Sequence, residues 1–241
     1  IKEQDEIREV WPLPVLGIVP FYRLSSKQTL IDQLAATDPL YEAFRNIRNG
    51  VRFAGVDQQI NILAVTSCVP SEGKSTVMAN LAICMAQDGQ RVVIVDCDLR
   101  RPTQHRMFPT LSNEKGISGV LTGACSVDEA IQATPVENLS VLTSGPVPAN
   151  PGRLVESLRL RQVLQGLAGK FDMVLVDAPP LLIVGDAVAL SRAAKGLVIV
   201  VEAGKTPRRM IADLRARAEA AGVEPTGIVL NKVDVRSGMQ A

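Results

Sequence analysis

The residues most able to do chemistry lie at positions 71–76, in the run SEGKST between an apolar segment and an amphipathic one. The order glycine, lysine and hydroxyl residue is typical of the end of a P-loop, a turn that binds nucleotide phosphates. Backbone N–H groups in such a turn point at phosphate oxygens, and the dipole of the following helix strengthens the attraction. We expect Lys74 to reach the terminal phosphates of ATP and the Ser75 hydroxyl to bind Mg²⁺. The expected phosphate-binding residues are Ser71, Glu72, Gly73, Lys74, Ser75 and Thr76.

One position departs from the full P-loop pattern. Cys68 stands five residues before Gly73, where the full pattern has glycine. On this stretch alone, the alternative interpretation is a strand, a turn and a helix that carry a chance G-K-S-T run. The choice between the two depends on whether other parts of the chain supply acidic partners for the loop.

Two acidic motifs supply such partners. Asp96 and Asp98 follow the apolar run 92–95, and Asp177 follows the apolar run 173–176. An aspartate that ends a strand near a P-loop is the usual Walker B arrangement, in which the carboxylate helps to hold Mg²⁺. Buried carboxylates repel one another unless a cation or protons are present, which also favours a metal ion. Each aspartate taken alone is equally well explained as the cap of the next helix.

These aspartates have different expected roles. We expect Asp98 and Asp177 to bind Mg²⁺ together with Ser75, and Asp96 to accept a proton from the substrate. The choice between Asp96 and Asp98 stays open, because residues two apart on an extended segment project to the same side.

Three further positions are weaker candidates. Arg100 and Arg101 directly follow the acidic pair, so they either touch phosphates or are exposed loop arginines. Asn231 ends an apolar run where its amide can pair with the adenine edge, although asparagine is also common at strand ends. His105 follows a proline turn and is expected at the surface rather than as a ligand.

The segments that must position these residues alternate in character. Apolar runs fall at residues 92–95, 139–142, 173–176, 197–201 and 227–230, and helical patterns at residues 75–87, 153–168, 186–194 and 207–221. Strands that alternate with helices imply right-handed crossovers and a doubly wound, mostly parallel sheet with helices on both faces. Ligands of such sheets bind beyond the carboxyl ends of the strands, where the loop and both acidic motifs are expected. The predicted fold is an α/β P-loop NTPase.

Composition narrows the possible partners. Aromatic residues make up 3% of the 241 residues, which suits a helix-covered parallel sheet better than a β-sandwich. The net charge of +1 gives no reason to expect a nucleic-acid partner. No apolar run approaches the roughly 20 residues of a membrane span, and a start at Ile1 instead of Met suggests a piece of a longer protein. The cysteines lack metal-ligand spacing and favour a reducing cytosolic compartment; they are Cys68, Cys84, Cys97 and Cys125.

The first part of the chain divides near residue 38. A charged run followed by Pro12, Pro14 and Pro20 predicts an extended lead-in over residues 1–37, before a domain at 38–241. From residue 38 onward, apolar residues at helical spacing predict an amphipathic helix. A solvated face explains the charges on its opposite side without any function; they are Glu42, Arg45, Arg48 and Arg52.

With three motifs in order, the chain resembles the bacterial tyrosine kinases of polysaccharide export, the BY-kinases. TSCVPSEGKST, VVIVDCDLRRP and MVLVDAPP are similar to the Walker A, Walker A′ and Walker B motifs of that family. DPLYEAFRNIRNGVRFAG is similar to its E-x-x-R-x-x-R helix, whose motif falls on Glu42, Arg45 and Arg48. The likeness covers most of residues 38–235, and LPVLGIVP resembles the usual lead-in from a transmembrane region.

The resemblance implies an ATP- and Mg²⁺-dependent kinase that phosphorylates tyrosines near its own C-terminus, in trans within a ring of identical subunits. It implies a role in capsular or exopolysaccharide synthesis and export, on the cytoplasmic face of the bacterial inner membrane. The implied partners are a transmembrane co-polymerase that activates the kinase, fused or separate, and a cognate tyrosine phosphatase. Glu42, Arg45 and Arg48 would then face a neighbouring subunit, which reverses the solvated-face interpretation.

Two features depart from the family pattern. Ser71 stands where the family commonly has glycine, and its β-carbon restricts the loop. A tyrosine-rich tail is also missing, because Tyr22 and Tyr41 are the only tyrosines in this sequence. Tyr41 adjoins Glu42 and is expected in packing or at an interface. Either the tyrosine-rich tail is not included in this sequence, or the protein phosphorylates something else.

Two alternative functions fit the same fold. An ATPase switch of the MinD/ParA type shares the sheet, the loop and the paired aspartates, but its loop normally has lysine where this chain has Val69. A non-catalytic assembly module would use ATP only to close a ring. Incubation with Mg-ATP separates the three functions, since they predict phosphotyrosine, phosphate release without labelling, and neither product.

Overall fold

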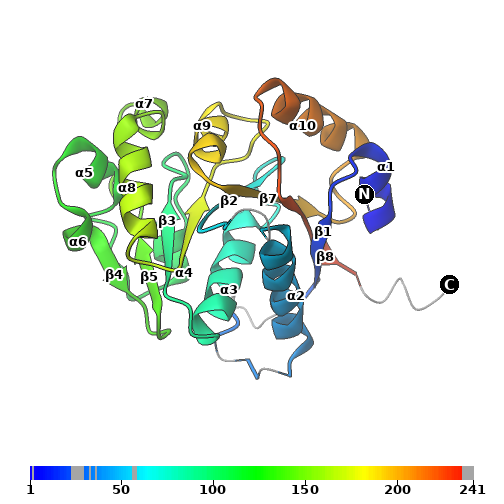
Figure 1. The fold of residues 1–241 in the computed structure, drawn as a ribbon, viewed down its shortest axis with the longest axis horizontal. Coiled ribbons are helices and arrows are strands. Elements are labelled where there is room, and N and C mark those ends of the chain that lie inside the picture. Colours follow the sequence, from blue (N-terminus) through cyan, green and yellow to red (C-terminus); the bar gives the residue numbers. More distant parts are fainter. Residues whose placement is uncertain (2, 23–29, 33, 36, 56–58, 235–241) are drawn as a thin grey trace.

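The computed structural model describes residues 1–241 apart from 2, 23–29, 33, 36, 56–58 and 235–241. In this part of the chain one sheet has the strand order β1-β8-β7-β2-β6-β3-β5-β4 (Figure 1). Every pair is parallel except β4 with β5. The strands are β1 (Val15–Pro20), β2 (Ile62–Ser67), β3 (Val92–Asp96), β4 (Ile131–Ala133), β5 (Leu139–Leu142), β6 (Met173–Asp177), β7 (Gly196–Glu202) and β8 (Gly227–Val233).

Helices cover both faces of the sheet. Helices α2 and α3 lie side by side on one face, and α9 and α10 lie on the other (Figure 1). Each face has its own apolar core, one containing Phe44 of α2 and the other containing Leu214 of α10. The helices are α1 (Gln4–Val10), α2 (Pro39–Ala54), α3 (Lys74–Gln87), α4 (Gln104–Met107), α5 (Ile117–Thr122), α6 (Val127–Ala130), α7 (Pro151–Val155), α8 (Leu158–Ala168), α9 (Asp186–Ala193) and α10 (Arg208–Ala220).

The central strands are apolar on both of their faces. Every residue of β2, β3 and β6 is buried, as expected for strands that helices cover from both sides. These strands are neighbours in the order β2-β6-β3, so their carboxyl ends meet at one edge of the sheet. The predicted doubly wound, mostly parallel fold is confirmed, and the strand order brings the loop and both acidic motifs together.

The N-terminal segment differs from its prediction. An extended lead-in was expected, but residues 4–10 form α1 and residues 15–20 form β1, which pairs in parallel with β8. Helix α1 contacts α10, and Ile7 and Trp11 are buried in the core on that face. The prolines are compatible with this arrangement. Pro20 is the last residue of an edge strand, so its missing N–H removes no hydrogen bond from the interior of the sheet.

Two other segments differ from the sequence pattern. The single helix predicted over residues 153–168 is two helices, since Ser157 accepts a hydrogen bond from the backbone N–H of Leu160 and caps a new helix. Residues 117–133 form α5, α6 and the short edge strand β4, none of which the pattern indicated. Alternating runs reveal long buried strands better than they reveal short edge elements.

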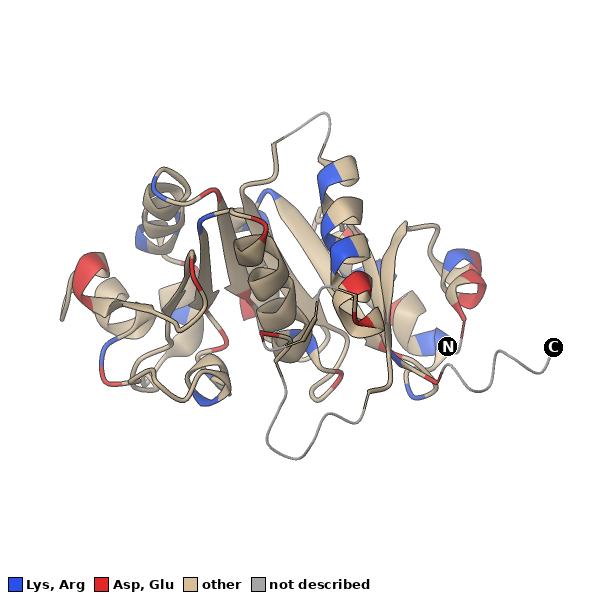
Figure 2. Ribbon diagram, turned by 90° about the horizontal axis from the view of Figure 1, so that it is seen from below, with Lys and Arg blue, Asp and Glu red and all other residues tan. Residues whose placement is uncertain are grey.

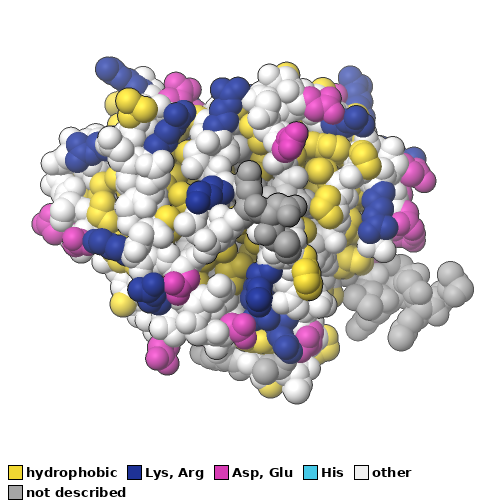
Figure 3. Space-filling model, in the orientation of Figure 1, with side chains coloured by type: hydrophobic (Ala, Val, Ile, Leu, Met, Phe, Trp, Pro, Cys, Tyr) yellow, Lys and Arg dark blue, Asp and Glu magenta, His cyan; other side chains and the backbone are white. Residues whose placement is uncertain are grey.

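Charges on the surface are mixed in sign. Figure 3 shows Lys and Arg interspersed with Asp and Glu across the face of the molecule that it displays. Among the residues that the structure describes, no helix is long and apolar enough to cross a membrane.

Candidate active site

The loop between β2 and α3 has the backbone of a phosphate-binding turn. Ser71 has a φ of 71° and Gly73 a φ of 91°, so both lie in the left-handed region. Glycine suits position 73, because a side chain is strained at this φ and a β-carbon would displace the side-chain nitrogen of Asn231. Ser71 has the same left-handed backbone conformation although it carries a β-carbon, so its backbone is strained. This strain was expected from the replacement of the family's glycine by serine. Helix α3 begins at Lys74, so its N-terminal N–H groups point into the loop.

Glu72 shapes this loop from the inside. Its buried carboxylate accepts hydrogen bonds from the backbone N–H of Val69 at 2.8 Å, from the hydroxyl of Thr206 and from the backbone N–H of Glu202 at 3.3 Å. The side chain thus ties the loop to the segment after β7, and only its backbone N–H is left for phosphate. Cys68 is buried beside it, and burial raises the pKa of this thiol, so it packs as a small apolar residue.

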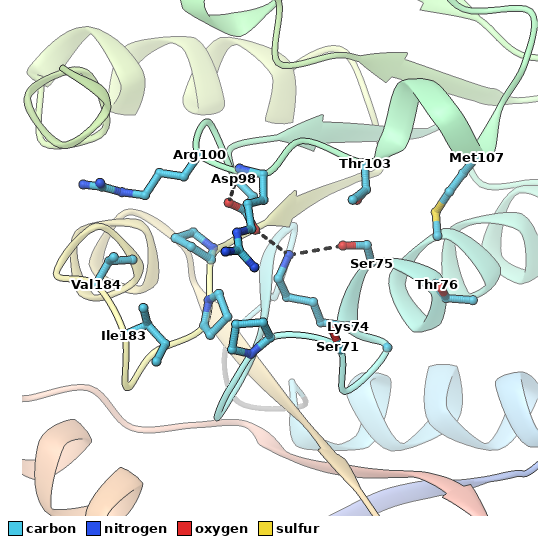
Figure 4. A pocket seen from close by; sticks show the side chains of 15 residues that line it. Ser71, Lys74, Ser75, Thr76, Asp98, Arg100, Thr103, Met107, Ile183 and Val184 are labelled. Atoms are coloured by element: carbon cyan, nitrogen blue, oxygen red, sulfur yellow. Dashed lines mark hydrogen bonds and ion pairs between the residues drawn. The ribbon is translucent and has the colours of Figure 1, made fainter. Parts of the chain in front are cut away.

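Lys74 is the centre of the site. Its Nζ lies 2.9 Å from Asp177 Oδ1. It also lies 2.9 Å from Asp98 Oδ2 and 3.1 Å from Ser75 Oγ (Figure 4). Burial disfavours the charge on Lys74, but Asp177 and Asp98 outweigh that effect and raise its pKa. The structure therefore brings together three residues from the P-loop, the β3 turn and the end of β6, as the sequence predicted.

Asp96 has a different environment from Asp98. It is fully buried, does not line the cavity, and its Oδ2 accepts the backbone N–H groups of Thr103 and Gln104 at 3.0 Å each. Burial, followed by the charge of Asp177, raises the pKa of Asp96 to about 7. Strand β3 ends at Asp96, so Asp98 lies in the turn beyond it, where its Oδ1 accepts the N–H of Arg101. The extended-segment argument that left the two aspartates equivalent is wrong.

A cavity of about 530 Å³ opens in front of Lys74 and Asp98 (Figure 4). Its volume is in the range of small-molecule sites. The polar lining comes from the P-loop and the β3 turn. Pro179, Pro180, Ile183 and Val184 form an apolar wall, and Met107 lies across the cavity from Ile183, beside Thr76 (Figure 4).

The two arginines of the β3 turn both line this cavity. Arg100 Nε donates to Asp186 Oδ2 at 2.8 Å, so the start of α9 holds this guanidinium at the edge of the cavity. Arg101 lies beside it without a described ion-pair partner in the structure. His105 does not line the cavity, and it is half-buried on α4, although a surface position was expected.

Asn231 supports the loop through its side-chain amide. Its Nδ2 donates to the backbone oxygen of Glu72 at 2.8 Å, so one of its two N–H donors is already used. The same residue lines a second cavity of about 170 Å³, beside Gly73 and Thr76 and on the side of α2. Phe21 and Tyr22 also line this second cavity.

The charged residues of α2 differ in how deeply they are buried. Figure 2 shows the basic residues in the later turns of α2 and an acidic residue near its start. Glu42 and Arg45 are exposed enough to form a surface ion pair with each other. Arg48 is buried and pairs with Asp88 at the end of α3, so the prediction that all three charges lie on an outer face is wrong for Arg48.

The residues present fit a divalent cation. Two carboxylates and one hydroxyl already surround the ammonium group of Lys74, so a cation-binding arrangement of oxygens exists. Hard cations such as Mg²⁺ prefer these oxygen ligands. Among the described residues no group of three or more His, Cys, Asp or Glu side chains forms a metal site by itself. Ser75 and Asp177 would therefore hold the ion together with phosphate oxygens, with Asp98 beside them.

Sequence reasoning missed two residues of the site. Thr206 donates to Glu72 and lies far along the chain, and Gln104 donates to Asp177 from the start of α4. Neither belongs to a recognisable motif, and no sequence signal pointed to them.

Comparison with known proteins identifies a family and relatives for this chain. A family model described as AAA domain matches residues 60–214. The tyrosine-protein kinase YwqD of Bacillus subtilis is 39% identical over 201 residues, which are 82% of this chain and 84% of YwqD. The tyrosine-protein kinase Etk of Escherichia coli K12 is 36% identical over 200 residues, but these are only 27% of Etk.

Among solved structures, the chain superposes better on a tyrosine-kinase domain than on a cell-division ATPase. The kinase domain of Etk superposes with a TM-score of 0.89 at 32% identity and covers 97% of this chain, which in turn covers 96% of that domain. The cell-division ATPase MinD of Pyrococcus furiosus has a TM-score of 0.61 at 26% identity, over 71% of each chain.

Proposed function

The chain belongs to the bacterial tyrosine-protein kinases, and from this premise we propose that it transfers the γ-phosphoryl group of Mg-ATP to tyrosine hydroxyls in the cavity beside Lys74. The observation that carries the proposal is the meeting of Ser75, Asp98 and Asp177 around the Lys74 ammonium at the edge of that cavity. Phosphoryl transfer needs positioning and electrostatic stabilisation more than covalent chemistry from the protein. These residues supply both.

Lys74 has two sets of partners in this mechanism. Without nucleotide its ammonium neutralises Asp98 and Asp177. With nucleotide, Lys74 leaves the carboxylates for the terminal phosphates, and the N–H groups at positions 71–75 bind the remaining phosphate oxygens. Ser75 and Asp177 would then hold Mg²⁺, whose charge would balance that of the phosphates, and Asp98, released by Lys74, would face the acceptor.

Asp98 is the proton acceptor that we propose for the tyrosine hydroxyl. It lines the cavity, whereas Asp96 is fully buried behind it with one oxygen held by two backbone N–H groups. A general base must come within hydrogen-bond reach of the proton that it removes. Geometry therefore favours Asp98 over Asp96, the initial candidate, which then acts as a buried support for the turn.

The apolar wall of the cavity fits the acceptor side chain. A phenol ring has an apolar body and a polar tip, so it can lie against Pro179, Pro180 and Ile183 with its hydroxyl toward Asp98. Arg100 and Arg101 at the same cavity favour acceptor segments that carry negative charge. The nucleotide base fits the second cavity, where Asn231 contributes by holding the loop.

The cellular setting follows from the family resemblance and is part of the proposal. The protein acts on the cytoplasmic face of the inner membrane in capsular or exopolysaccharide export, with a transmembrane co-polymerase as activator and a tyrosine phosphatase as antagonist. It assembles into a ring of identical subunits, for which Glu42 and Arg45 of α2 are available at the surface. The match covers only 27% of Etk, which leaves room in such a protein for an activator fused to the kinase domain.

The experiment is incubation of the full-length protein with Mg-ATP, followed by detection of phosphotyrosine and of released phosphate. The kinase proposal expects tyrosine labelling in the wild type and none in Lys74→Met. Lys195→Met removes an exposed lysine elsewhere and serves as the matched control. Phosphate release without labelling would instead indicate a MinD-like switch, and neither product would indicate a passive assembly module.

A further inference from the structure

Gln104 is a buried residue that contacts all three motifs of the site. It is the first residue of α4 and is completely inaccessible to solvent. Its Nε2 donates to Asp177 Oδ2 at 2.7 Å and lies 3.4 Å from the backbone oxygen of Ser75. Its backbone N–H donates to Asp96 Oδ2. One residue therefore links the P-loop helix with the ends of β3 and β6.

The two oxygens of Asp177 have different partners. Oδ1 accepts from the Lys74 ammonium at 2.9 Å, and Oδ2 accepts from Gln104 at 2.7 Å. A carboxylate held at one oxygen can still rotate about its last torsion, whereas one held at both oxygens has a fixed orientation. The amide of Gln104 thus turns Oδ1 toward the place where a cation binds.

The orientation of the amide follows from its partner. An ionised carboxylate only accepts hydrogen bonds, so the NH₂ group and not the oxygen of Gln104 must face Asp177. Among the described residues, the side-chain oxygen of Gln104 is buried without a hydrogen-bond partner. An orphaned polar atom destabilises the fold, and an apolar side chain of similar volume would avoid that penalty. The amide is therefore explained by what its nitrogen does for Asp177.

We propose that Gln104 is a positioning residue for phosphoryl transfer, which fixes the Asp177 carboxylate so that one oxygen faces the metal bound with the nucleotide. The inference rests on the proposed function, in which Asp177 is a metal ligand. Residues that orient metal ligands typically change metal affinity or activity by about 10- to 100-fold when they are replaced.

The test compares nucleotide binding with and without Mg²⁺ in Gln104→Met. Binding of a fluorescent ADP analogue in EDTA should stay within about twofold of the wild type, because the loop that holds the phosphates is unchanged. The gain in affinity on adding Mg²⁺ should fall by about tenfold, and kcat for tyrosine phosphorylation should fall by at least as much. Gln132→Met is the control, since its amide bonds only to the backbone of Ser112 at the far edge of the sheet.

An unchanged Mg²⁺ gain in a folded Gln104→Met variant would overturn the inference and assign Gln104 to core packing. Gln104→Asn gives a second test if Gln104→Met does not fold, because it keeps the amide but is one carbon too short for the contact. The binding measurement needs no kinase activity. A wild type that shows the Mg²⁺ gain but forms no phosphotyrosine would contradict the proposed function alone.

Discussion

At the scale of single residues, the site is governed by charge compensation around Lys74. Asp98 and Asp177 are both largely inaccessible to solvent, and two such carboxylates without a cation would repel each other. The Lys74 ammonium supplies that cation in the nucleotide-free protein. Phosphate binding and carboxylate neutralisation therefore compete for one lysine, and in the proposed function a metal ion would take over the neutralisation.

Lys74→Met should affect stability as well as activity. It leaves two buried carboxylates unpaired, which we expect to lower the free energy of unfolding by roughly 3 kcal/mol in EDTA. Mg²⁺ should restore part of this loss, because it can take the place of the ammonium group. Urea denaturation with and without Mg²⁺ measures both effects. Equal stability of the variant and the wild type in EDTA would contradict the buried charge arrangement.

Asp96→Asn should change how stability depends on pH in the nucleotide-free protein. The pKa of Asp96 is raised from 3.8 to about 7, so the native state favours the protonated form. The stability that this carboxyl contributes is present below pH 4 and is lost as pH rises through about 7. Relative to the wild type, Asp96→Asn should gain roughly 2–4 kcal/mol in unfolding free energy between pH 4 and pH 8.

Denaturation curves at several pH values measure this difference. Asp213→Asn is the matched control, because Asp213 is exposed on α10 and its replacement should leave the pH dependence unchanged. A constant difference between Asp96→Asn and the wild type at all pH values would show that Asp96 has no raised pKa.

At the scale of elements, the P-loop is held from outside its own sequence. Glu72 connects it to the segment between β7 and α10, and Asn231 at the end of β8 holds its backbone. Strand β8 in turn pairs with β1, and α1 contacts α10. The N-terminal segment therefore packs on the same elements that support the loop.

Helix α2 gives a matched pair of substitutions. Arg48 is buried against Asp88, so Arg48→Ala should lower the unfolding free energy of the monomer by about 1–2 kcal/mol through lost packing and pairing. Arg45 forms a surface ion pair with Glu42, so Arg45→Ala should leave monomer stability nearly unchanged. If α2 forms the ring interface, Arg45→Ala should still reduce assembly.

Thermal unfolding at low concentration and light scattering at high concentration separate these effects. A stable Arg48→Ala monomer that fails to assemble would place Arg48 at the interface instead of in the fold. Unchanged assembly of Arg45→Ala would remove that residue from the proposed interface.

At the scale of the whole molecule, one sheet edge collects the chemistry. The strand order β2-β6-β3 places the P-loop, Asp177 and Asp98 side by side, although they are far apart in the sequence. Both faces of the sheet are covered by helices, so the open side of the site is the cavity beyond the carboxyl ends of the strands. Nucleotide and acceptor must therefore meet there.

The sequence by itself determined the fold class and the motifs. Short apolar runs that alternate with helical patterns indicate strands buried on both faces, and the carboxyl ends of neighbouring parallel strands meet at one edge. This is why Lys74, Ser75, Asp98 and Asp177 could be grouped before the structure was known. The strand that contains residues 15–20 was missed, because its pairing with β8 depends on a segment more than 200 positions away.

Only the tertiary structure decided how the residues within the site divide their roles. It buries Asp96 and exposes Asp98 to the cavity, turns Glu72 inward, pairs Arg48 with Asp88, and brings Gln104 to Asp177. The physical reason is that a motif fixes residue types and approximate positions along the backbone. Which oxygen meets which donor depends on side-chain packing between segments that are distant in sequence.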